Sequence, residues 1–138
     1  MPNARDEGIR VLIVEDDEDS AEALAFALQR AGYRTATASS SVGALCALRG
    51  PERPAVMLLD LNLADLGGPA LVDVFKTEGN LPPIVLISAA PPHVIRAAAE
   101  ALHALAALRK PFPVQALLDA LPAARTTPGP PRPGARPG

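Results

Sequence analysis

A short apolar run that ends in a single carboxylate constrains the fold of this chain most. The apolar residues 55–59 lead without interruption into Asp60, and the run is bounded by Pro54 before it and by Gly67 and Gly68 after it. A run of this length between chain-breaking residues is typical of a strand buried on both faces of a sheet. Asp60 is therefore expected at the carboxyl end of a central strand, the edge where open α/β sheets bind their ligands. Such an acid either caps the loop that follows or takes part in chemistry.

The rest of the chain alternates between strand-like and helix-like patterns. Strands are expected at 9–14, 33–38, 55–60, 84–88 and 105–109, and helices at 20–31, 41–48, 69–76, 92–102 and 114–124. The fifth strand has the local propensity of a helix and is assigned from the alternation and from the stop at Lys110 and Pro111. The alternation predicts an α/β fold in which a doubly wound, five-stranded parallel sheet carries helices on both faces.

Length and composition predict a single domain and argue against binding to nucleic acid or crossing a membrane. We expect a flexible N-terminus at 1–8, one domain at 9–124, and a disordered tail at 125–138, where proline, glycine and arginine replace core-forming residues. The net charge of −2 gives no reason to expect direct binding of nucleic acid. The longest uncharged stretch, 79–95, contains four prolines and does not suit a membrane span. With a single cysteine and no apolar leader, a cytoplasmic location is expected.

Charged and polar side chains stand where the predicted strands end. Glu15 and Asp16 follow the first strand, and Asp60 ends the third. Ser88 ends the fourth strand, and Lys110 follows the fifth. Because the carboxyl ends of parallel strands lie at one edge, three carboxylates, a hydroxyl and an ammonium should meet there. Clustered carboxylates repel one another unless a cation intervenes, and hard oxygen ligands suit Mg²⁺. An ionised Asp60 could then accept a phosphoryl group, with Lys110 and Ser88 stabilising its charge.

Four motifs in this order give the chain a family resemblance. They are Val-Leu-Ile-Val-Glu-Asp-Asp at 11–17, Met-Leu-Leu-Asp-Leu-Asn-Leu at 57–63, Val-Leu-Ile-Ser-Ala at 85–89 and Lys-Pro-Phe at 110–112. The chain resembles a two-component response regulator receiver domain, of the stand-alone kind similar to the chemotaxis regulator. The resemblance implies a flavodoxin-like sheet with strand order 2-1-3-4-5. It is specific because all four motifs match in order and spacing.

The resemblance also implies a role for each residue of the site. Asp60 becomes the phosphoacceptor, and Mg²⁺ is expected as the cofactor. The metal ligands would be Glu15, Asp16, Asp60 and the backbone carbonyl of Asn62, with Asp16 a more direct ligand than Glu15. Asp17, which follows the pair, is assigned to the loop or to the start of the helix rather than to the metal.

The remaining site residues are also carried over from the family. Ser88 keeps the hydroxyl of the usual threonine, and Lys110 is the lysine of the family pattern. The peptide bond from Lys110 to Pro111 is expected to be cis.

The resemblance further implies partners. A sensor histidine kinase or a histidine phosphotransfer protein would supply the phosphoryl group, and a downstream protein target would read the modification. Any catalytic contribution would be limited to self-phosphorylation from a donor and slow self-dephosphorylation, so the chain is not expected to be an enzyme. No membrane partner is implied. A homodimer, if one forms, would use the face made by the fourth helix, the fifth strand and the fifth helix.

Two alanines, Ala64 and Ala107, depart from the family pattern, and a third, Ala90, bears on the lifetime of the modification. Ala64 replaces a usual proline, which loosens the loop after Asp60. Ala107 replaces the aromatic residue that in relatives swings inward when the hydroxyl residue moves, so it cannot report phosphorylation by a rotamer change. Ala90, two residues after Ser88, is small and predicts an acyl phosphate that is open to water and short-lived.

Two other functions stay open from the sequence. Ala107 favours a phosphorylation-independent pseudo-receiver that acts as an interaction or scaffold domain. An aspartyl-phosphate phosphatase of the haloacid dehalogenase type would also use an Asp at a strand end. Its pattern needs a second Asp two residues later, where this chain has Asn62, and it needs a cap domain that this sequence does not contain.

Overall fold

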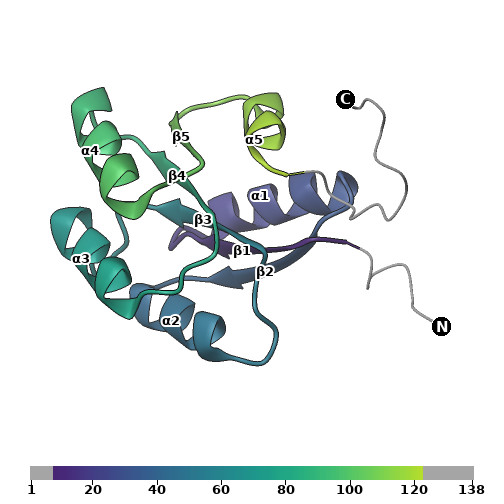
Figure 1. Cartoon of the computed structure of the whole chain (residues 1–138). Helices are drawn as coiled ribbons and strands as arrows, with labels where there is room; N and C mark the ends of the chain where they lie inside the picture. Colours follow the sequence, from purple (N-terminus) through teal and green to yellow (C-terminus); the bar gives the residue numbers. More distant parts are fainter. Residues whose placement is uncertain (1–7, 123–138) are drawn as a thin grey trace, which may run out of the picture.

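The computed structural model describes residues 8–122, and within them it has the predicted α/β architecture (Figure 1). The strands are β1 (Arg10–Val14), β2 (Arg34–Ala38), β3 (Val56–Asp60), β4 (Ile84–Ser88) and β5 (Ala106–Arg109). The helices are α1 (Glu18–Arg30), α2 (Ser41–Arg49), α3 (Gly68–Glu78), α4 (Pro92–Leu102) and α5 (Val114–Ala120). The strands form one parallel sheet in the order β2-β1-β3-β4-β5, which confirms the predicted topology.

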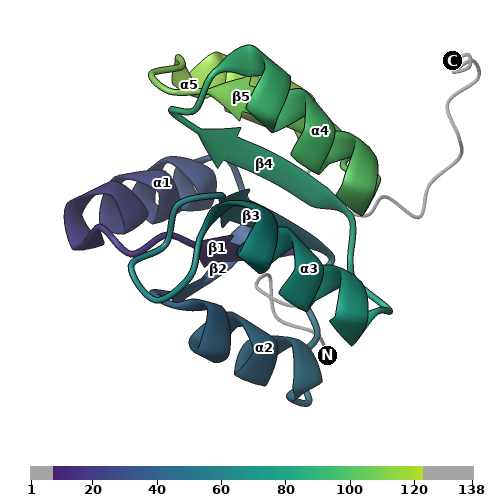
Figure 2. The ribbon, with the colours of Figure 1, turned by 90° about the vertical axis from the view of Figure 1, so that its left-hand side faces the viewer.

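The helices cover both faces of this sheet. Helices α2, α3 and α4 lie along one face, and α1 and α5 lie on the other (Figures 1 and 2). Each face has its own apolar core. Leu71 and Phe75 of α3 pack under the first group of helices, and Leu28 of α1 and Leu117 of α5 pack under the second. Strands β3 and β4 are buried along their whole length because both of their faces are covered, as the apolar run at 55–59 indicates.

The ends of α3 and α5 differ from the sequence prediction because of local backbone preferences. Helix α5 ends at Ala120 rather than at residue 124, because Leu121 is extended, with φ −94° and ψ 152°. A residue before proline is sterically driven out of the helical region, and Pro122 follows Leu121. Helix α3 runs two residues past 76 to Glu78 and stops at Gly79, where φ is +67°.

The expectations for the two ends of the chain fall largely outside the described residues. The predicted flexible N-terminus and the predicted tail at 125–138 concern residues 1–7 and 123–138, so both stay predictions. Among residues 8–122, no helix is long and apolar enough to cross a membrane.

Candidate functional site

The register of the sheet brings the predicted site residues to one edge. Val14, the last residue of β1, pairs with Leu59, so Glu15 follows at the level of Asp60. Asp60 pairs with Ile87. Ser88, the last residue of β4, therefore lies one step past the level of Asp60 and pairs with Arg109, and Lys110 follows directly after β5. The edge expected from the strand-end pattern is thus the edge that the structure forms.

Lys110 joins the two most buried acids of this edge. Its ammonium nitrogen lies 2.8 Å from Oδ2 of Asp60 and 3.0 Å from Oε1 of Glu15. Glu15 and Asp60 are only 3% and 4% exposed, respectively. Buried carboxylates are costly unless a cation pairs with them. Lys110 supplies that charge from the end of β5, across the sheet from Glu15 at the end of β1.

The ionisation of this cluster follows from burial and from the shared cation. Burial raises the pKa of Glu15, and the hydrogen bond from Lys110 offsets that rise only in part. The neighbouring charge of Asp60 also raises the pKa of Glu15. Burial alone would lower the pKa of Lys110, but its bonds to Asp60 and Glu15 outweigh burial and raise it. The lysine is therefore held in its charged form, and the two acids still repel each other.

The carboxylates of Glu15, Asp16 and Asp60 could hold a divalent cation. Each offers an oxygen, and these oxygens lie within 4.8 Å of one another. Hard oxygen donors are the ligands that Mg²⁺ prefers, and Asp16 is more open to solvent than the other two acids.

Asp17 has the structural role that the sequence suggested. It is the N-cap of α1, and its side chain accepts a hydrogen bond of 2.8 Å from the backbone N–H of Ser20. Its own N–H donates to Oε2 of Glu15 at 3.2 Å. The chain after β1 therefore orients Glu15 while Asp17 begins the helix.

Loop amides complete the surroundings of the acceptor. The backbone N–H of Asn62 donates to Oδ1 of Asp60 at 2.9 Å, so both carboxylate oxygens of Asp60 accept a hydrogen bond. The fully buried Ser88 accepts a bond of 3.0 Å from the N–H of Ala90 through its Oγ. Among residues 8–122, the Ser88 hydroxyl forms no hydrogen bond to Asp60 or Lys110. The peptide bond from Lys110 to Pro111 is cis, as the resemblance implied.

Two contacts beside the site were not foreseen. Nε of Arg109 donates to the carbonyl oxygen of Ala90 at 3.0 Å, which ties β5 to the loop after β4. Asp65, in the loop after Asp60, accepts hydrogen bonds from Ser41 at the start of α2. Arg109 could have been suspected because it alternates with the inward Leu108 beside Lys110. The Asp65 contact joins residues 24 positions apart, and no local pattern signals it.

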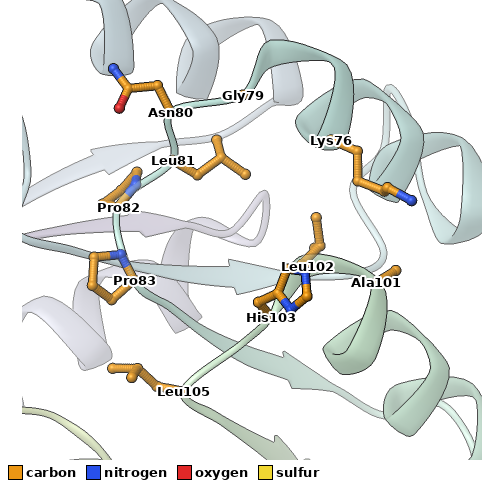
Figure 3. Close-up of a pocket in the computed structure, with 10 residues that line it drawn as sticks. All are labelled: Lys76, Gly79, Asn80, Leu81, Pro82, Pro83, Ala101, Leu102, His103 and Leu105. Carbon is orange, nitrogen blue, oxygen red and sulfur yellow. The ribbon is translucent and has the colours of Figure 1, made fainter.

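A pocket of about 540 Å³ lies at the opposite edge and is not part of this site (Figure 3). Residues of the loop before β4, including Leu81 and Pro83, line it together with Leu102 and His103 at the end of α4. Among the described residues that line it, Lys76 brings a cationic side chain and none is Asp or Glu. The pocket is therefore separate from the cluster of Glu15, Asp60 and Lys110 at the carboxyl edge of the sheet.

Comparison with known proteins gives a consistent picture. Residues 11–122 match the response regulator receiver domain as a family. The chain is 32% identical over 89 residues to the probable transcriptional regulatory protein TcrX of Mycobacterium tuberculosis, which covers 64% of this chain and 38% of that protein. It is 35% identical over 77 residues to the DNA-binding response regulator MtrA of Mycobacterium leprae, covering 56% of this chain and 34% of that protein. The matched segment thus spans about a third of these curated relatives.

Solved structures of response regulators are similar to this chain in fold. A response regulator from Burkholderia pseudomallei, with a phosphorylated aspartic acid, a calcium ion and citrate, is 28% identical with a TM-score of 0.70, covering 83% of this chain and 66% of that chain. The chemotaxis protein CheY4 of Vibrio cholerae is 25% identical with a TM-score of 0.70, covering 81% of this chain and 94% of that chain.

Proposed function

The chain belongs to the response regulator receiver domain family, and from this membership we propose that it accepts a phosphoryl group on Asp60. The observation that carries the proposal is the contact of Lys110 with Asp60 and Glu15 beside a third carboxylate, that of Asp16. An ordinary strand-end cap would not need a lysine that follows β5 and two further acids that follow β1.

Each residue of the site has its own role in the proposed phosphoryl transfer. One carboxylate oxygen of Asp60 forms a bond to phosphorus as the bond from phosphorus to the donor imidazole nitrogen breaks, and the imidazole leaves with that electron pair. The Lys110 ammonium pairs with Oδ2 of Asp60 before the transfer. It is close enough to pair with the phosphoryl oxygens afterwards and to stabilise their negative charge. The hydroxyl proton of Ser88 is available for the same oxygens, because Oγ already accepts from Ala90.

Glu15, Asp16, Asp60 and the Asn62 carbonyl would hold Mg²⁺ in this site. When bound, the ion supplies positive charge that a phosphoryl group requires next to three acids. The amide of Asp17 keeps Glu15 turned toward the cluster. The phosphorylated aspartic acid and calcium ion of the Burkholderia pseudomallei regulator support both assignments.

The family membership also supports the kind of partner that we propose. A sensor histidine kinase or a histidine phosphotransfer protein would donate the phosphoryl group, and a protein target would read it. The net charge of −2 supports no direct contact with nucleic acid. MtrA is named as a DNA-binding protein, but the matched segment covers only 34% of it, so the name describes a protein about three times as long as the match. We further propose that any homodimer uses the face of α4, β5 and α5, and that the chain signals rather than catalyses.

Ala107 is the observation that favours the second candidate, a pseudo-receiver that acts without phosphorylation. It lies exposed on β5, where relatives carry an aromatic switch. Against this candidate stands the complete set of acids and lysine at the acceptor, which a scaffold domain would not require.

The deciding experiment is phosphorylation by a small donor such as acetyl phosphate with Mg²⁺, followed by intact mass. The wild type should gain one phosphoryl group, Asp60→Asn should gain none, and the exposed-acid control Asp73→Asn should behave as the wild type. Once the donor is removed, the mass gain should decay quickly, because Ala90 leaves the acyl phosphate open to water. Absence of any gain, where a known receiver reacts, would establish the pseudo-receiver. Repeated turnover of phosphoesters would instead indicate an enzyme of the haloacid dehalogenase type.

A further inference from the structure

The loop that follows Asp60 is folded back on itself. Asn62 forms an isolated antiparallel bridge with Gly67, and the N–H of Leu63 donates to the carbonyl of Leu66 at 3.2 Å. This pairing makes the segment 61–67 a narrow hairpin-like loop, and its tip is made of residues 64 and 65. Both tip residues are exposed. The position of the tip therefore sets the direction of the two short arms, one of which contains Asn62.

Asp65 fastens the tip of this loop to the start of α2. Its two carboxylate oxygens lie 3.1 and 3.0 Å from the backbone nitrogen of Ser41, and Oδ2 accepts a bond of 2.6 Å from the Ser41 hydroxyl. The first N–H groups of a helix lack partners within the helix, and a negative charge near them is favourable. Ser40 already caps α2 through Gly43, so Asp65 adds a second partner from a distant loop. The side-chain bond from Ser41, together with its backbone bond, lowers the pKa of Asp65 and keeps it ionised.

Asn62 lies between Asp60 and the contact of Asp65 with Ser41. Its N–H donates to Oδ1 of Asp60, the group that changes chemically when a phosphoryl group arrives. Its bridge with Gly67 does not depend on Asp60, and the contact of Asp65 with Ser41 adds a support from outside the loop. A proline at position 64 would restrict the tip through its fixed φ angle, and this chain has alanine there.

We propose that Asp65 and Ser41 are a positioning pair that holds the loop 61–67 so that the Asn62 carbonyl faces the metal ligands Glu15, Asp16 and Asp60. The inference rests on the proposed function, since it concerns the same metal site. Neither residue touches the metal or the phosphoryl group. Removal of a residue that positions a metal ligand commonly weakens metal binding by about 10-fold or more, because the ligand is then no longer held in place.

The test compares Asp65→Ala and Ser41→Ala with the wild type in the full 138-residue chain. Asp73→Asn is the control, since Asp73 is an exposed acid on α3. Calorimetry with Mg²⁺ should show about 10-fold weaker binding for Asp65→Ala. Ser41→Ala should lose less affinity, because its backbone N–H still reaches Asp65. The control should bind as the wild type does.

Two further measurements separate positioning from a loss of general stability. Hydrogen exchange without Mg²⁺ should be faster in Asp65→Ala for the amides of Leu63 and Gly68, which donate within the loop to Leu66 and Leu61. Phosphorylation by acetyl phosphate should need more Mg²⁺ to reach half its maximal rate. The rate at saturating Mg²⁺ should stay within about twofold of the wild type, since no group at the reacting atoms is removed.

The outcomes are distinct. Equal Mg²⁺ affinity in the wild type and Asp65→Ala, with or without faster exchange of the loop amides, overturns the positioning role alone. If Asp65→Ala does not fold, Ser41→Ala decides in the same way. A wild-type chain that binds no Mg²⁺ overturns the proposed metal site, and this inference with it.

Discussion

The ammonium nitrogen of Lys110 lies 2.8 Å from a carboxylate oxygen of Asp60, and the same nitrogen lies 3.0 Å from Glu15. The cation that follows β5 thus pairs with two acids from other strands: Glu15, which follows β1, and Asp60, which ends β3. The side chains of Glu15 and Asp60 are 2% and 6% exposed, so water does little to stabilise their charges. Lys110 is therefore expected to stabilise the metal-free domain in addition to its proposed role in phosphoryl transfer.

Replacement of Lys110 should reveal this structural contribution. We expect Lys110→Ala to lower the free energy of unfolding without Mg²⁺ by about 1–3 kcal/mol, measured by urea denaturation. The loss is smaller than for a fully buried pair because a third of the Lys110 side chain is exposed. Asp60→Asn should cost less or even stabilise the domain, because it relieves the repulsion that raises the pKa of Glu15.

The double variant provides the control for this prediction. Asp60→Asn in the Lys110→Ala background should recover part of the lost stability, since only one buried acid then lacks a cation. Equal stability of Lys110→Ala and the wild type would contradict the view that Lys110 compensates the two acids.

The sequence was sufficient to predict the sheet and the edge that holds the site. The apolar runs before Glu15, Asp60 and Ser88 indicate buried strands, and parallel strands bring their ends together. The fifth strand shows the limit of local propensity. Residues 106–109 form a strand because Val85 to Ser88 of β4 pair with them, although their composition favours a helix.

What could not be predicted depends on the path of loops and on side-chain conformation. Asp65 meets Ser41 only because the loop after β3 bends toward α2. Arg109 reaches Ala90 only through its side-chain conformation. The apolar pattern in α5 predicts a helix to residue 124, whereas Pro122 ends it at Ala120, four residues earlier.

Ser88 offers a second prediction, on the rate of phosphoryl transfer. Ser88→Ala removes the hydroxyl that is available to the phosphoryl oxygens and also removes the acceptor for the Ala90 N–H. We expect phosphorylation by acetyl phosphate to slow by at least about 10-fold at saturating Mg²⁺, followed by intact mass. Ser88→Thr keeps the hydroxyl and should retain most of the rate. A rate unchanged in Ser88→Ala would exclude the proposed role of the hydroxyl.

A third prediction concerns acid stability and the contact between α2 and α3. Arg49 binds Glu78 through two hydrogen bonds of 3.0 and 2.6 Å, and its side chain lowers the pKa of Glu78 below the usual 4.5. Because the folded-state pKa is depressed, this contribution to stability is complete above about pH 4.5 and is lost as the pH falls through the folded-state pKa. The difference in unfolding free energy between wild type and Glu78→Gln should therefore be constant near neutral pH and shrink in acid.

The same pair should respond to salt and to the loss of either partner. Arg49→Gln should reproduce the acid profile of Glu78→Gln, and high salt should reduce both differences because Arg49 is exposed. Arg53, whose charge also lowers the pKa of Glu78, should have a smaller effect when replaced by Gln. A difference that persists unchanged at low pH would show that the ionised form of Glu78 does not matter.

The side chain of Arg109 connects β5 to the loop after Ser88. Ala107, on the same strand, is too short to reach that loop. Nε of Arg109 donates to the carbonyl of Ala90, and the Ala90 N–H in turn donates to Ser88. We expect Arg109→Ala to loosen this loop and to speed hydrogen exchange of the Ala90 amide by about fivefold, the equivalent of one net hydrogen bond. Arg96→Ala, which removes an exposed arginine of α4, is the matched control and should leave that amide unchanged. Beryllofluoride, a mimic of the phosphoryl group, should also shift the NMR signal of the Arg109 Nε–H, because any movement of Ser88 is passed to Ala90. A signal that stays fixed while the Ser88 amide shifts would show that the loop moves without involving β5, and that Arg109 does not replace the missing aromatic residue.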